Sequence, residues 1–497
     1  MSTDLGPTDA ASFDSVVIGA GPAGLAAAAA LTGAGRRCAL IDMGHLSGGQ
    51  FWRHPEPDLL AATGTDEGLG HHHWGTYRRL RESLDRAVTA DLLDYRPGTQ
   101  VWAITPLPDG AGFDLHLTAA VTAVEQAPTG PGPIRTRTLL LATGAYDRQL
   151  PFPGWTLPGV MAAGGVQALI KGHRVLAGRR AVVAGTGPFL LPVAANLARA
   201  GAASVTVCEA NSLARWGRDP WGAIQEPGKG LEGVEYAGTF LRHRIGLRTR
   251  TTVVAALGDE RVEAVRLARL DATGTVVPGT EREVEADLVA TGWGFTPSLE
   301  LPLALDADVR VCADGSLVVD VDADQRTSVA GVFAAGEITG VGGATQALAE
   351  GELAGLSVLA ELGTALDDRR RGKLRRRVAR GSRFAAAMHA ATPVPAHWSS
   401  WLTDDTLICR CEEVTYGALR ALGEEVDATE PRTLRIAGRP GMGMCQGRVC
   451  GYAVGCLGHH GPGAATADEL AALGRRPLAT PVRLGELADP VVESSAS

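Results

Sequence analysis

The stretch Ser15-Val-Val-Ile18-Gly19-Ala-Gly21-Pro22-Ala23-Gly24 decides the fold of this chain. Its first four residues predict a buried parallel strand, and the residues after Pro22 predict a helix that ends at a glycine. Asp42 follows at the end of the next apolar run. This order predicts a Rossmann-type dinucleotide-binding unit, because the glycines let a pyrophosphate approach the helix N-terminus and the acid accepts hydrogen bonds from a ribose. The residues predicted to form this site are Gly19, Gly21, Pro22, Ala23, Gly24 and Asp42.

A second unit of the same kind is predicted at residues 180–209, where Gly185-Thr-Gly187-Pro-Phe-Leu190 separates an apolar strand from a helix. Glu209 ends the following strand and would repel the 2′-phosphate of NADP, so the favoured ligand is NAD or an adenine nucleotide. Leu190 stands where the motif has a small residue, and a unit that keeps its fold without a ligand is an equal alternative. The candidate residues are Gly185, Gly187 and Glu209.

Five of the eight cysteines lie close together near the C-terminus, which indicates metal or redox chemistry rather than a disulfide scaffold. Cys409-Arg-Cys411 and Cys445-Gln-Gly-Arg-Val-Cys450 form two pairs, and four thiolates suffice for one [2Fe–2S] cluster. A zinc site is the alternative, although zinc sites usually have Cys-x₂₋₄-Cys spacing. The remaining Cys456 is expected to be a small buried residue.

Composition and net charge favour an enzyme and argue against some classes of binding protein. The 497 residues predict more than one domain, and the 45% apolar content with 64 glycines is typical of α/β enzymes. The net charge of -8 argues against an overall affinity for nucleic acid or anionic lipid. The most apolar N-terminal run is too short to cross a bilayer and no basic segment precedes it, so we expect a cytoplasmic protein without a transmembrane segment.

Segments rich in proline and glycine predict the boundaries between domains. The basic stretch at 369–383 is expected to be a solvated helix face, and docking of an acidic partner is the alternative. The predicted parts are an arm at 1–12, a first nucleotide-binding domain at 13–152 and 285–362, a second at 153–284, a basic helical linker at 363–400, a cysteine domain at 401–462 and a loop-rich tail at 463–497.

Two later segments, Leu139-Leu-Leu-Ala142-Thr143-Gly144 and Gly331-Val-Phe-Ala-Ala-Gly336-Glu337, resemble the returning strands of FAD enzymes in the glutathione and thioredoxin reductase superfamily. The resemblance implies FAD in the first domain, with Glu337 at the acidic position that binds the flavin ribityl chain. Gly48-Gly49-Gln50 resembles the loop beside the isoalloxazine, and the following residues could cover the ring, although His54 is expected to be a surface histidine. The residues that the resemblance adds are Gly49, Gln50, Ala142, Thr143, Gly144, Gly336 and Glu337.

The predicted fold class is therefore α/β, with two Rossmann-like domains of the glutathione/thioredoxin reductase type and a small C-terminal [2Fe–2S] domain. Disulfide reductases pass electrons through a cysteine pair beside the flavin. Cys38, Cys208 and Cys312 have no partner at short spacing, so dithiol chemistry is not expected.

The cysteine motifs resemble the domain named after bacterioferritin-associated ferredoxin, whose four cysteines carry a [2Fe–2S] cluster. Together with Phe152-Pro-Gly-Trp-Thr-Leu-Pro-Gly-Val160, they make residues 13–457 resemble the α-type subunits of hydrogen cyanide synthase, opine oxidase and proline or hydroxyproline dehydrogenase complexes. In such complexes a D-amino-acid-oxidase-like β subunit oxidises the substrate C–N bond, and a small ferredoxin-like γ subunit is often present. FMN at a subunit boundary is compatible with the resemblance, but no motif marks it.

The resemblance implies a protein that relays electrons through FAD and an iron–sulfur centre. No acid–base constellation for amine oxidation is recognisable in this chain, so the sequence leaves its catalytic residues unknown. One alternative is a self-sufficient NADH-dependent reductase that reduces an external acceptor. Another is a structural scaffold whose nucleotide sites have no redox role.

Overall fold

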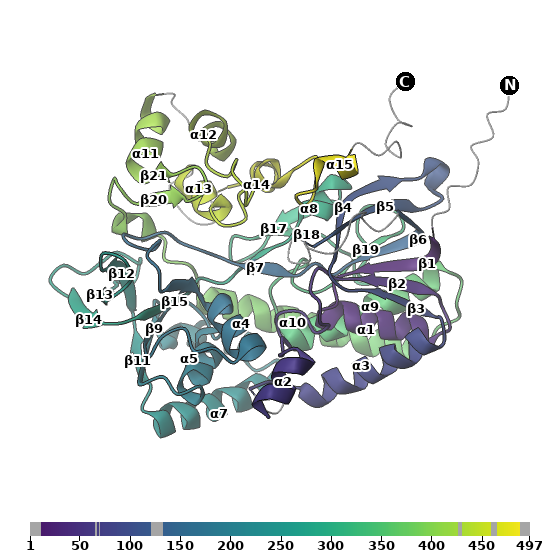
Figure 1. Cartoon of the computed structure of the whole chain (residues 1–497), viewed down its shortest axis with the longest axis horizontal. Helices are drawn as coiled ribbons and strands as arrows, with labels where there is room; N and C mark the ends of the chain where they lie inside the picture. Colours follow the sequence, from purple (N-terminus) through teal and green to yellow (C-terminus); the bar gives the residue numbers. More distant parts are fainter. Residues whose placement is uncertain are drawn as a thin grey trace.

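The computed structural model describes residues 11–64, 67–68, 70–120, 133–425, 430–458 and 465–487. Two α/β units lie side by side, and a helical domain that carries the clustered cysteines rests against both (Figure 1). The fold is thus the α/β arrangement with two Rossmann-like units that the sequence predicts.

The first sheet has the strand order β3-β2-β1-β6-β5-β4, and β19 pairs with β6. β1, β2, β3, β6 and β19 run parallel, whereas β4 and β5 are antiparallel. The parallel strands are apolar because both faces of this sheet are covered. The strands are β1 Ala11–Ile18, β2 Cys38–Ile41, β3 Leu93–Arg96, β4 Thr99–Pro106, β5 Phe113–Ala119, β6 Ile134–Leu141 and β19 Val332–Ala334.

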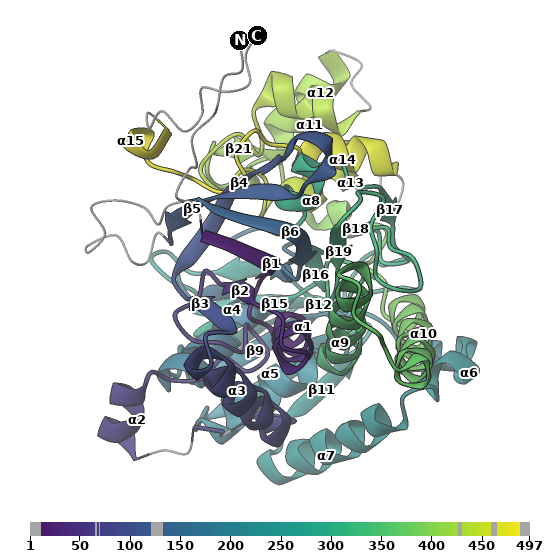
Figure 2. The ribbon, with the colours of Figure 1, turned by 90° about the vertical axis from the view of Figure 1, so that its right-hand side faces the viewer.

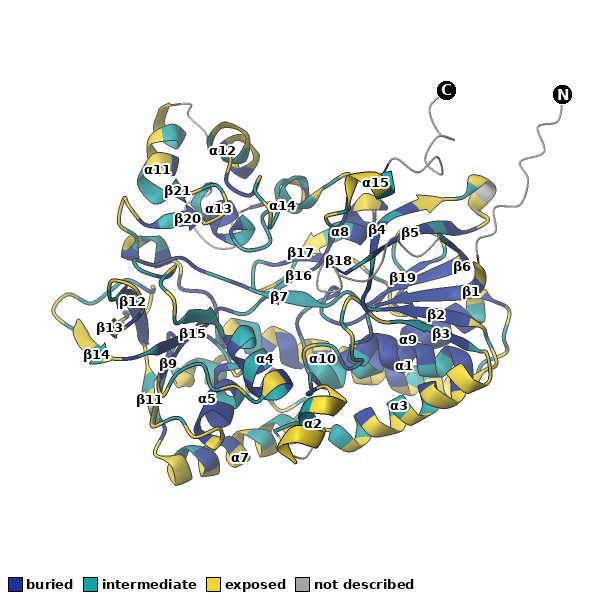
Figure 3. Cartoon of the chain, in the orientation of Figure 1, coloured by how far each residue is buried: buried dark blue, intermediate teal, exposed yellow. Residues whose placement is uncertain are grey.

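Helices cover one face of this sheet, as Figures 2 and 3 show. α1 (Pro22–Gly33) is rich in alanine and packs closely against α9 (Ala344–Glu361). A Cβ at Gly351 would collide with the carbonyl of Ala23, so the close approach of the two helices requires glycine there. α3 Trp74–Thr89 and α10 Asp368–Ala391 contribute to the core on this side, whereas α2 Pro57–Thr63 buries none of its residues.

Small elements pack against the opposite face of the first sheet and bury its apolar side chains. They include a short hairpin and α14, so the C-terminal part of the chain contributes to this core. Their bounds are α8 Glu300–Ala304, β17 Val309–Val311, β18 Leu317–Val319 and α14 Ala467–Gly474.

The second sheet is wholly parallel in the order β11-β10-β9-β15-β8, and a three-stranded antiparallel sheet of β12, β13 and β14 covers one of its faces. The strands are β8 Val160–Ala162, β9 Arg180–Gly185, β10 Ser204–Glu209, β11 Gly246–Thr249, β12 Thr251–Leu257, β13 Ala264–Arg269, β14 Arg282–Glu285 and β15 Leu288–Gly292. The helices of this unit are α4 Ala163–His173, α5 Leu190–Arg199, α6 Pro220–Ala223 and α7 Pro227–His243.

Two short antiparallel strands, β7 (Ala145–Asp147) and β16 (Phe295–Pro297), connect the two units. The cysteine domain follows α10 and docks on the second unit through Trp155, whose indole N–H donates to the carbonyl of Leu407 (2.7 Å). Its elements are β20 Leu407–Cys409, β21 Val414–Thr415, α11 Tyr416–Glu425, α12 Pro431–Gly438 and α13 Gly451–Gly458, and α15 Leu484–Leu487 lies beyond α14.

Several predicted boundaries need correction. The second unit extends to Gly292 rather than 284, because β15 pairs with both β8 and β9. Ala11 and Ser12 belong to β1 and not to an arm, since they pair with the start of β6. The predicted tail is anchored, because α14 packs on the first unit and the Ala479 N–H donates to the carbonyl of Trp102 (2.9 Å). The rest of the arm, residues 1–10, lies outside the described residues.

The predicted basic linker is a helix that packs on α9. Some of its arginines form ion pairs within the chain: Arg370 pairs with Glu352 (2.7 Å), and Arg375 pairs with Asp324. Arg376, Arg377 and Arg380 are exposed, as expected for a solvated face.

Candidate functional site

The glycine turn between β1 and α1 is closely packed on one side and open on the other. A Cβ at Gly19, which has a φ of +106°, would collide with the carbonyl of Ala142, and one at Gly24 would collide with the carbonyl of Gly19. A Cβ at Gly21 would meet no atom within 4 Å. The turn therefore leaves room for a phosphate group beside Gly21, at the N-terminus of α1.

Asp42 holds this turn in place. Its carboxylate accepts hydrogen bonds from the backbone N–H groups of Ala20 and Gly44 (2.6 Å for Gly44). Burial raises the pKa of Asp42, although these two bonds oppose the rise. Each carboxylate oxygen can accept a second hydrogen bond, so the predicted role of Asp42 toward a ribose is compatible with this geometry.

The other predicted FAD residues meet at the same edge of the sheet. The Gly48 N–H donates to the carbonyl of Ala20 (2.8 Å), and a Cβ at Gly49 would lie 2.9 Å from the Cα of Gly21. The Ala142 N–H donates to the carbonyl of Ile18 (2.8 Å), which fixes the end of β6 against the turn. Gln50 is exposed, and its side-chain carbonyl accepts from the Arg53 guanidinium (3.1 Å).

Thr143 and Gly144 link this edge to the connection between the units. The Thr143 hydroxyl donates to the carbonyl of Ser298 (2.8 Å), and the Ser298 N–H donates to the carbonyl of Gly144 (3.0 Å). His54, expected at the surface, is instead buried, with its Nδ1 2.8 Å from the carbonyl oxygen of Trp52. Its burial follows from packing against Trp74 and Tyr77, which only the tertiary structure brings near.

Three carboxylates gather where β19 ends. Glu337 is partly buried, and burial together with the charge of Asp147 raises its pKa to about 7. Asp147 accepts from the Gly164 N–H at the start of α4 (3.1 Å), and burial raises its pKa to about 6. Glu350 accepts from the Gly336 N–H (2.8 Å), and burial raises its pKa to about 7 as well.

Glu337 differs from its two neighbours, since its carboxylate has no hydrogen-bond partner among the described residues. Even a partly buried carboxylate without a donor is costly, and hydroxyl groups of a ligand would supply donors. The position at the end of β19 therefore fits the predicted role of Glu337 toward a ribityl chain. Sequence reasoning missed Asp147 and Glu350, although Asp147 lies only three residues beyond Gly144.

The glycine turn of the second unit is filled by the chain itself. Glu209 accepts from the Gly187 N–H (2.8 Å) and from the Asn211 N–H (2.9 Å), and burial raises its pKa. Thr392, just after α10, covers the turn, because a Cβ at Gly187 would lie 3.4 Å from its hydroxyl oxygen. The Thr186 hydroxyl also donates to the carbonyl of Thr392 (3.0 Å). This geometry favours the alternative that the turn retains its fold without a dinucleotide.

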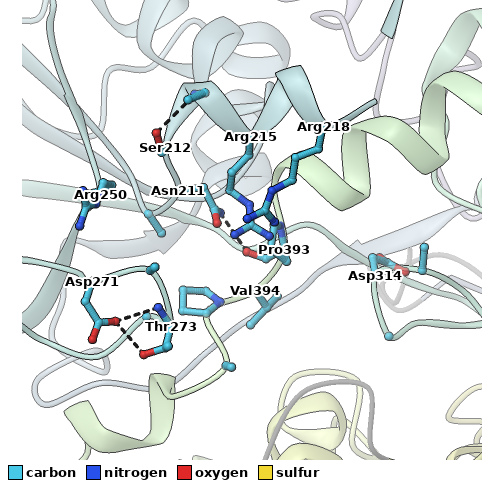
Figure 4. A pocket seen from close by; sticks show the side chains of 18 residues that line it. Asn211, Ser212, Arg215, Arg218, Arg250, Asp271, Thr273, Asp314, Pro393 and Val394 are labelled. Carbon is cyan, nitrogen blue, oxygen red and sulfur yellow. Dashed lines mark hydrogen bonds between the residues drawn. The ribbon is translucent and has the colours of Figure 1, made fainter. Parts of the chain in front are cut away.

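A cavity of about 570 Å³ lies beside that turn (Figure 4). Arg215, Arg218 and Arg250 line it, together with backbone of the segment that follows Thr392. None of the three arginines forms an ion pair within the part of the chain that the structure describes. Burial and the neighbouring Arg218 lower the pKa of Arg215. Asp271 and Asp314 also line the cavity, so its charge is mixed.

The four predicted ligand cysteines lie together. The Cys450 thiol donates hydrogen bonds to Cys409 and Cys445, and these bonds lower the pKa of both acceptors. Cys411 in turn interacts with Cys445. Cys409 and Cys450 are buried whereas Cys411 is exposed, so the group has an inner and an outer edge. The eight cysteines form no disulfide, and Cys456 is buried as expected.

Glycines shape the loop around the sulfurs. The Gly441 N–H donates to the Cys409 sulfur (3.5 Å), and a Cβ at Gly443 would collide with that of Cys411. Within the described ranges, no group of three or more His, Cys, Asp or Glu side chains is arranged so that it could hold a single metal ion. The four thiols instead meet through pairwise contacts.

Two partly buried arginines lie beside the thiols without an ion-pair partner in the described residues. Arg435 interacts electrostatically with Cys450, and Arg476 with Cys445. The Nε atoms of both arginines are buried without a hydrogen-bond partner. Burial and the repulsion from Arg435 and Arg448 lower the pKa of Arg476 to about 10. Such cations fit a site whose sulfurs are thiolates.

The family model for pyridine nucleotide-disulphide oxidoreductases matches residues 13–351, which include both Rossmann-like units. The chain belongs to the pyridine nucleotide-disulphide oxidoreductase family. As a member of this family it is an FAD-dependent oxidoreductase. The glycine turn, Asp42, the Gly49 loop and Glu337 are the residues of this family member that would hold the FAD.

Relatives of this family member extend over nearly the whole chain. The hydrogen cyanide synthase protein HcnB of Pseudomonas aeruginosa is 33% identical over 444 residues, which cover 88% of this chain and 91% of that protein. An opine oxidase subunit of Rhizobium meliloti is 33% identical over 500 residues, covering 96% of this chain and 98% of that protein. The resemblance to the hydrogen cyanide synthase and opine oxidase group is thereby confirmed.

A solved structure shares the fold of this oxidoreductase. The L-proline dehydrogenase from P. horikoshii aligns with a TM-score of 0.62 at 18% identity, covering 98% of this chain and 82% of that chain. At this identity the likeness concerns the fold. Among the described residues, no helix combines the length and the apolar character needed to cross a membrane.

Proposed function

We propose that this chain is the electron-transferring subunit of a heteromeric amine or amino-acid dehydrogenase or oxidase, with FAD in the first unit and a [2Fe–2S] cluster at the four cysteines. The observation that carries the proposal is the meeting of Cys409, Cys411, Cys445 and Cys450 beside an FAD-binding unit on the same chain. FAD accepts two electrons and a [2Fe–2S] centre accepts one, so a chain with both converts hydride chemistry into single-electron export.

The chain's own residues perform the binding and positioning. The open side of Gly21 admits the pyrophosphate, and Glu337 accepts hydrogen bonds from hydroxyl groups of the ligand. Asp147, which faces Glu337, holds the start of α4 through Gly164. Arg435 and Arg476 balance the negative charge of four thiolates.

The pairwise contacts of the four thiols favour a two-iron cluster over zinc. A single zinc ion needs four sulfurs around one centre, whereas a [2Fe–2S] cluster distributes its four thiolate ligands over two irons. The outer edge, formed by exposed Cys411 and by Met444, which is 86% exposed, is where an external acceptor would approach. The sequence resemblance implies that a small ferredoxin-like γ subunit is often present in such complexes, and it leaves the identity of the acceptor open.

The partner that oxidises the substrate is proposed from the names of the relatives, which are subunits of hydrogen cyanide synthase, opine oxidase and sarcosine oxidase. We propose a D-amino-acid-oxidase-like β subunit that removes hydride from a C–N bond of an opine, proline, hydroxyproline or glycine type of substrate. FMN at the boundary between the two chains is part of this proposal, although no residue of this chain marks its site.

The test is anaerobic purification together with any chains that co-purify. We expect FAD, about two irons and two acid-labile sulfides per chain, and an electron paramagnetic resonance signal that appears on reduction with dithionite. Zinc in place of iron, or a colourless protein, would contradict the proposal. Oxidation of an amino acid at full rate by this chain without a partner would contradict the assignment of the substrate site to another chain.

A second ligand, an adenine nucleotide, is proposed for the arginine-lined cavity rather than for the glycine turn. Thr392 covers the turn, whereas Arg215, Arg218 and Arg250 offer positive charge to phosphates. This placement argues against NADH as the electron donor. Anaerobic bleaching of the flavin by NADH would instead support a self-sufficient reductase, and an intact complex without redox-active cofactors would support a scaffold.

A further inference from the structure

Strand β7 lies between the candidate flavin site and the cysteine domain. It has three residues, Ala145–Asp147, and pairs with β16. Arg148 continues this pairing through its N–H to the carbonyl of Gly294 (3.0 Å). Successive side chains of a strand point to opposite sides, so Asp147 lies on one side and Tyr146 and Arg148 lie on the other.

Asp147 belongs to the flavin side of β7. It lies close enough to Glu337 for their charges to interact, and it accepts from the N–H of Gly164. β7 also follows directly on Ala142, Thr143 and Gly144, which lie against the glycine turn. One side of the strand therefore contributes to the candidate FAD site.

Tyr146 contacts the loop that carries two of the cysteines. Arg448, between Cys445 and Cys450 in the sequence, donates from Nε to the Tyr146 hydroxyl (3.0 Å). Its guanidinium carbon lies 5.7 Å from the centroid of the Tyr146 ring. A contact with Glu300 (2.7 Å) anchors Arg448 to the first unit.

Arg148 makes the second contact. Its side chain is 1% exposed, pairs with Asp314 (2.8 Å) and lies over Tyr452, with 4.0 Å between the guanidinium carbon and the ring centroid. Tyr452 stands two residues after Cys450, on α13. A buried cation against an aromatic face is a strong, desolvated contact, so this pair fixes α13 against β7.

The two pairs are reciprocal. An arginine of the cysteine domain contacts a tyrosine of β7, and an arginine beside β7 contacts a tyrosine of the cysteine domain. They flank Cys450, the buried ligand at the inner edge of the four-cysteine group. We propose that Tyr146, Arg148, Arg448 and Tyr452 are positioning residues that fix the four-cysteine site relative to the candidate FAD site, with β7 as the link between them.

This inference rests on the proposed function. The step that it concerns moves one electron from reduced FAD to the oxidised iron–sulfur centre, and no bond forms or breaks. The rate of such a transfer falls steeply with distance. A loosened α13 would therefore slow the transfer even where both cofactors remain bound.

The experiment uses the purified holoprotein with its co-purifying chains. The FAD is reduced by a laser-flash photoreductant, and its re-oxidation by the iron–sulfur centre is followed by absorbance. Tyr452→Leu removes the aromatic face, whereas Tyr452→Phe keeps it and serves as the rescue variant. Tyr146→Leu tests the second pair independently. Tyr416→Leu is the matched control, because Tyr416 packs within the cysteine domain against its own core.

We expect Tyr452→Leu and Tyr146→Leu each to slow the transfer severalfold, because the rate falls as the two cofactors move apart. Iron content, FAD content and the reduction potential of the centre should stay at wild-type values, and Tyr452→Phe and Tyr416→Leu should transfer at close to the wild-type rate. Unchanged rates in both Leu variants with full cofactor content would overturn the inference while the proposed function stands. Wild-type protein without iron would overturn the proposed function first.

Discussion

At the scale of single residues, the carboxylates near the end of β19 differ in their hydrogen bonds and share raised pKa values. Its carboxylate faces Asp147 and lacks a donor among the described residues, whereas Glu350 accepts from a backbone N–H. Burial and the charge of Asp147 raise the pKa of Glu337 to about 7, burial raises that of Glu350 to about 7, and burial raises that of Asp147 to about 6. In the chain without FAD, folding therefore favours their protonated forms.

The first prediction concerns pH and the FAD-free chain. A raised carboxyl pKa gives stability that is present below the unfolded value, near 4.5 for Glu, and lost as pH rises through about 7. The free energy of unfolding should therefore fall between about pH 5 and pH 8. Glu337→Gln should reduce this fall by about 1–3 kcal/mol, measured by denaturant titration at several pH values. Exposed Glu281→Gln is the control, and an equal fall in both variants would contradict the prediction.

The second prediction concerns the contact of α1 with α9. Gly351→Ala places a Cβ against the carbonyl of Ala23 and should destabilise the chain by about 1–3 kcal/mol through overpacking. Gly33→Ala, on α1 with no atom within 4 Å of the new Cβ, should leave stability unchanged or slightly raised. Chemical denaturation of both variants measures the difference. If the two variants were equally stable, the helices would not be as close as described.

At the scale of elements, the second Rossmann-like unit combines the predicted glycine turn with a cover from a distant part of the chain. β9, the turn and β10 form as the glycine pattern predicts. The end of α10, distant in sequence, then covers the turn with Thr392. The cavity beside the turn is lined by arginines from the segments that follow β10 and β11, namely Arg215, Arg218 and Arg250.

The third prediction follows from this cavity. Arg215→Gln and Arg218→Gln should each weaken binding of ATP by about ten- to a hundredfold, since each removes a charge-assisted hydrogen bond worth about 1.5–3 kcal/mol. Isothermal titration calorimetry measures the affinity. Arg242→Gln, an exposed change on α7, should have no effect. If ATP bound the wild type and both cavity variants equally, the nucleotide would lie elsewhere.

At the scale of the whole molecule, the cysteine domain joins the two units. Trp155 of the second unit binds β20, Arg448 binds β7 and Glu300, and α14 packs on the first unit. The sulfurs therefore lie in a domain held on several sides. Loss of one buried cysteine of the proposed cluster should affect this domain before the FAD unit.

The fourth prediction compares two buried cysteines of this domain. Cys450→Ala should remove most of the bound iron and leave the FAD content unchanged, because Cys450 contacts two other thiols of the proposed ligand set. Cys456→Ala, which changes a buried cysteine outside the proposed ligand set, should retain the iron. Iron analysis and the visible spectrum of both variants check the outcome. Equal iron in both would show that Cys450 is not a ligand.

The sequence by itself determined the α/β class, the two glycine turns and the residues that surround the first of them. These features depend on local rules, since a strand, a tight turn and a helix are specified by neighbouring residues. The four cysteines were likewise recognisable from their clustering. The boundary at Gly292 was not, because a strand's sheet depends on which distant strand it pairs with.

Only the tertiary structure decided which distant groups meet. It brought Asp147 and Glu350 to Glu337, placed Thr392 over the second turn, and paired Tyr146 and Arg148 of β7 with Arg448 and Tyr452. No local pattern encodes these contacts, because they arise where separately specified elements pack together and bury charge. Burial also sets the pKa of each carboxyl, and burial is a property of the folded chain.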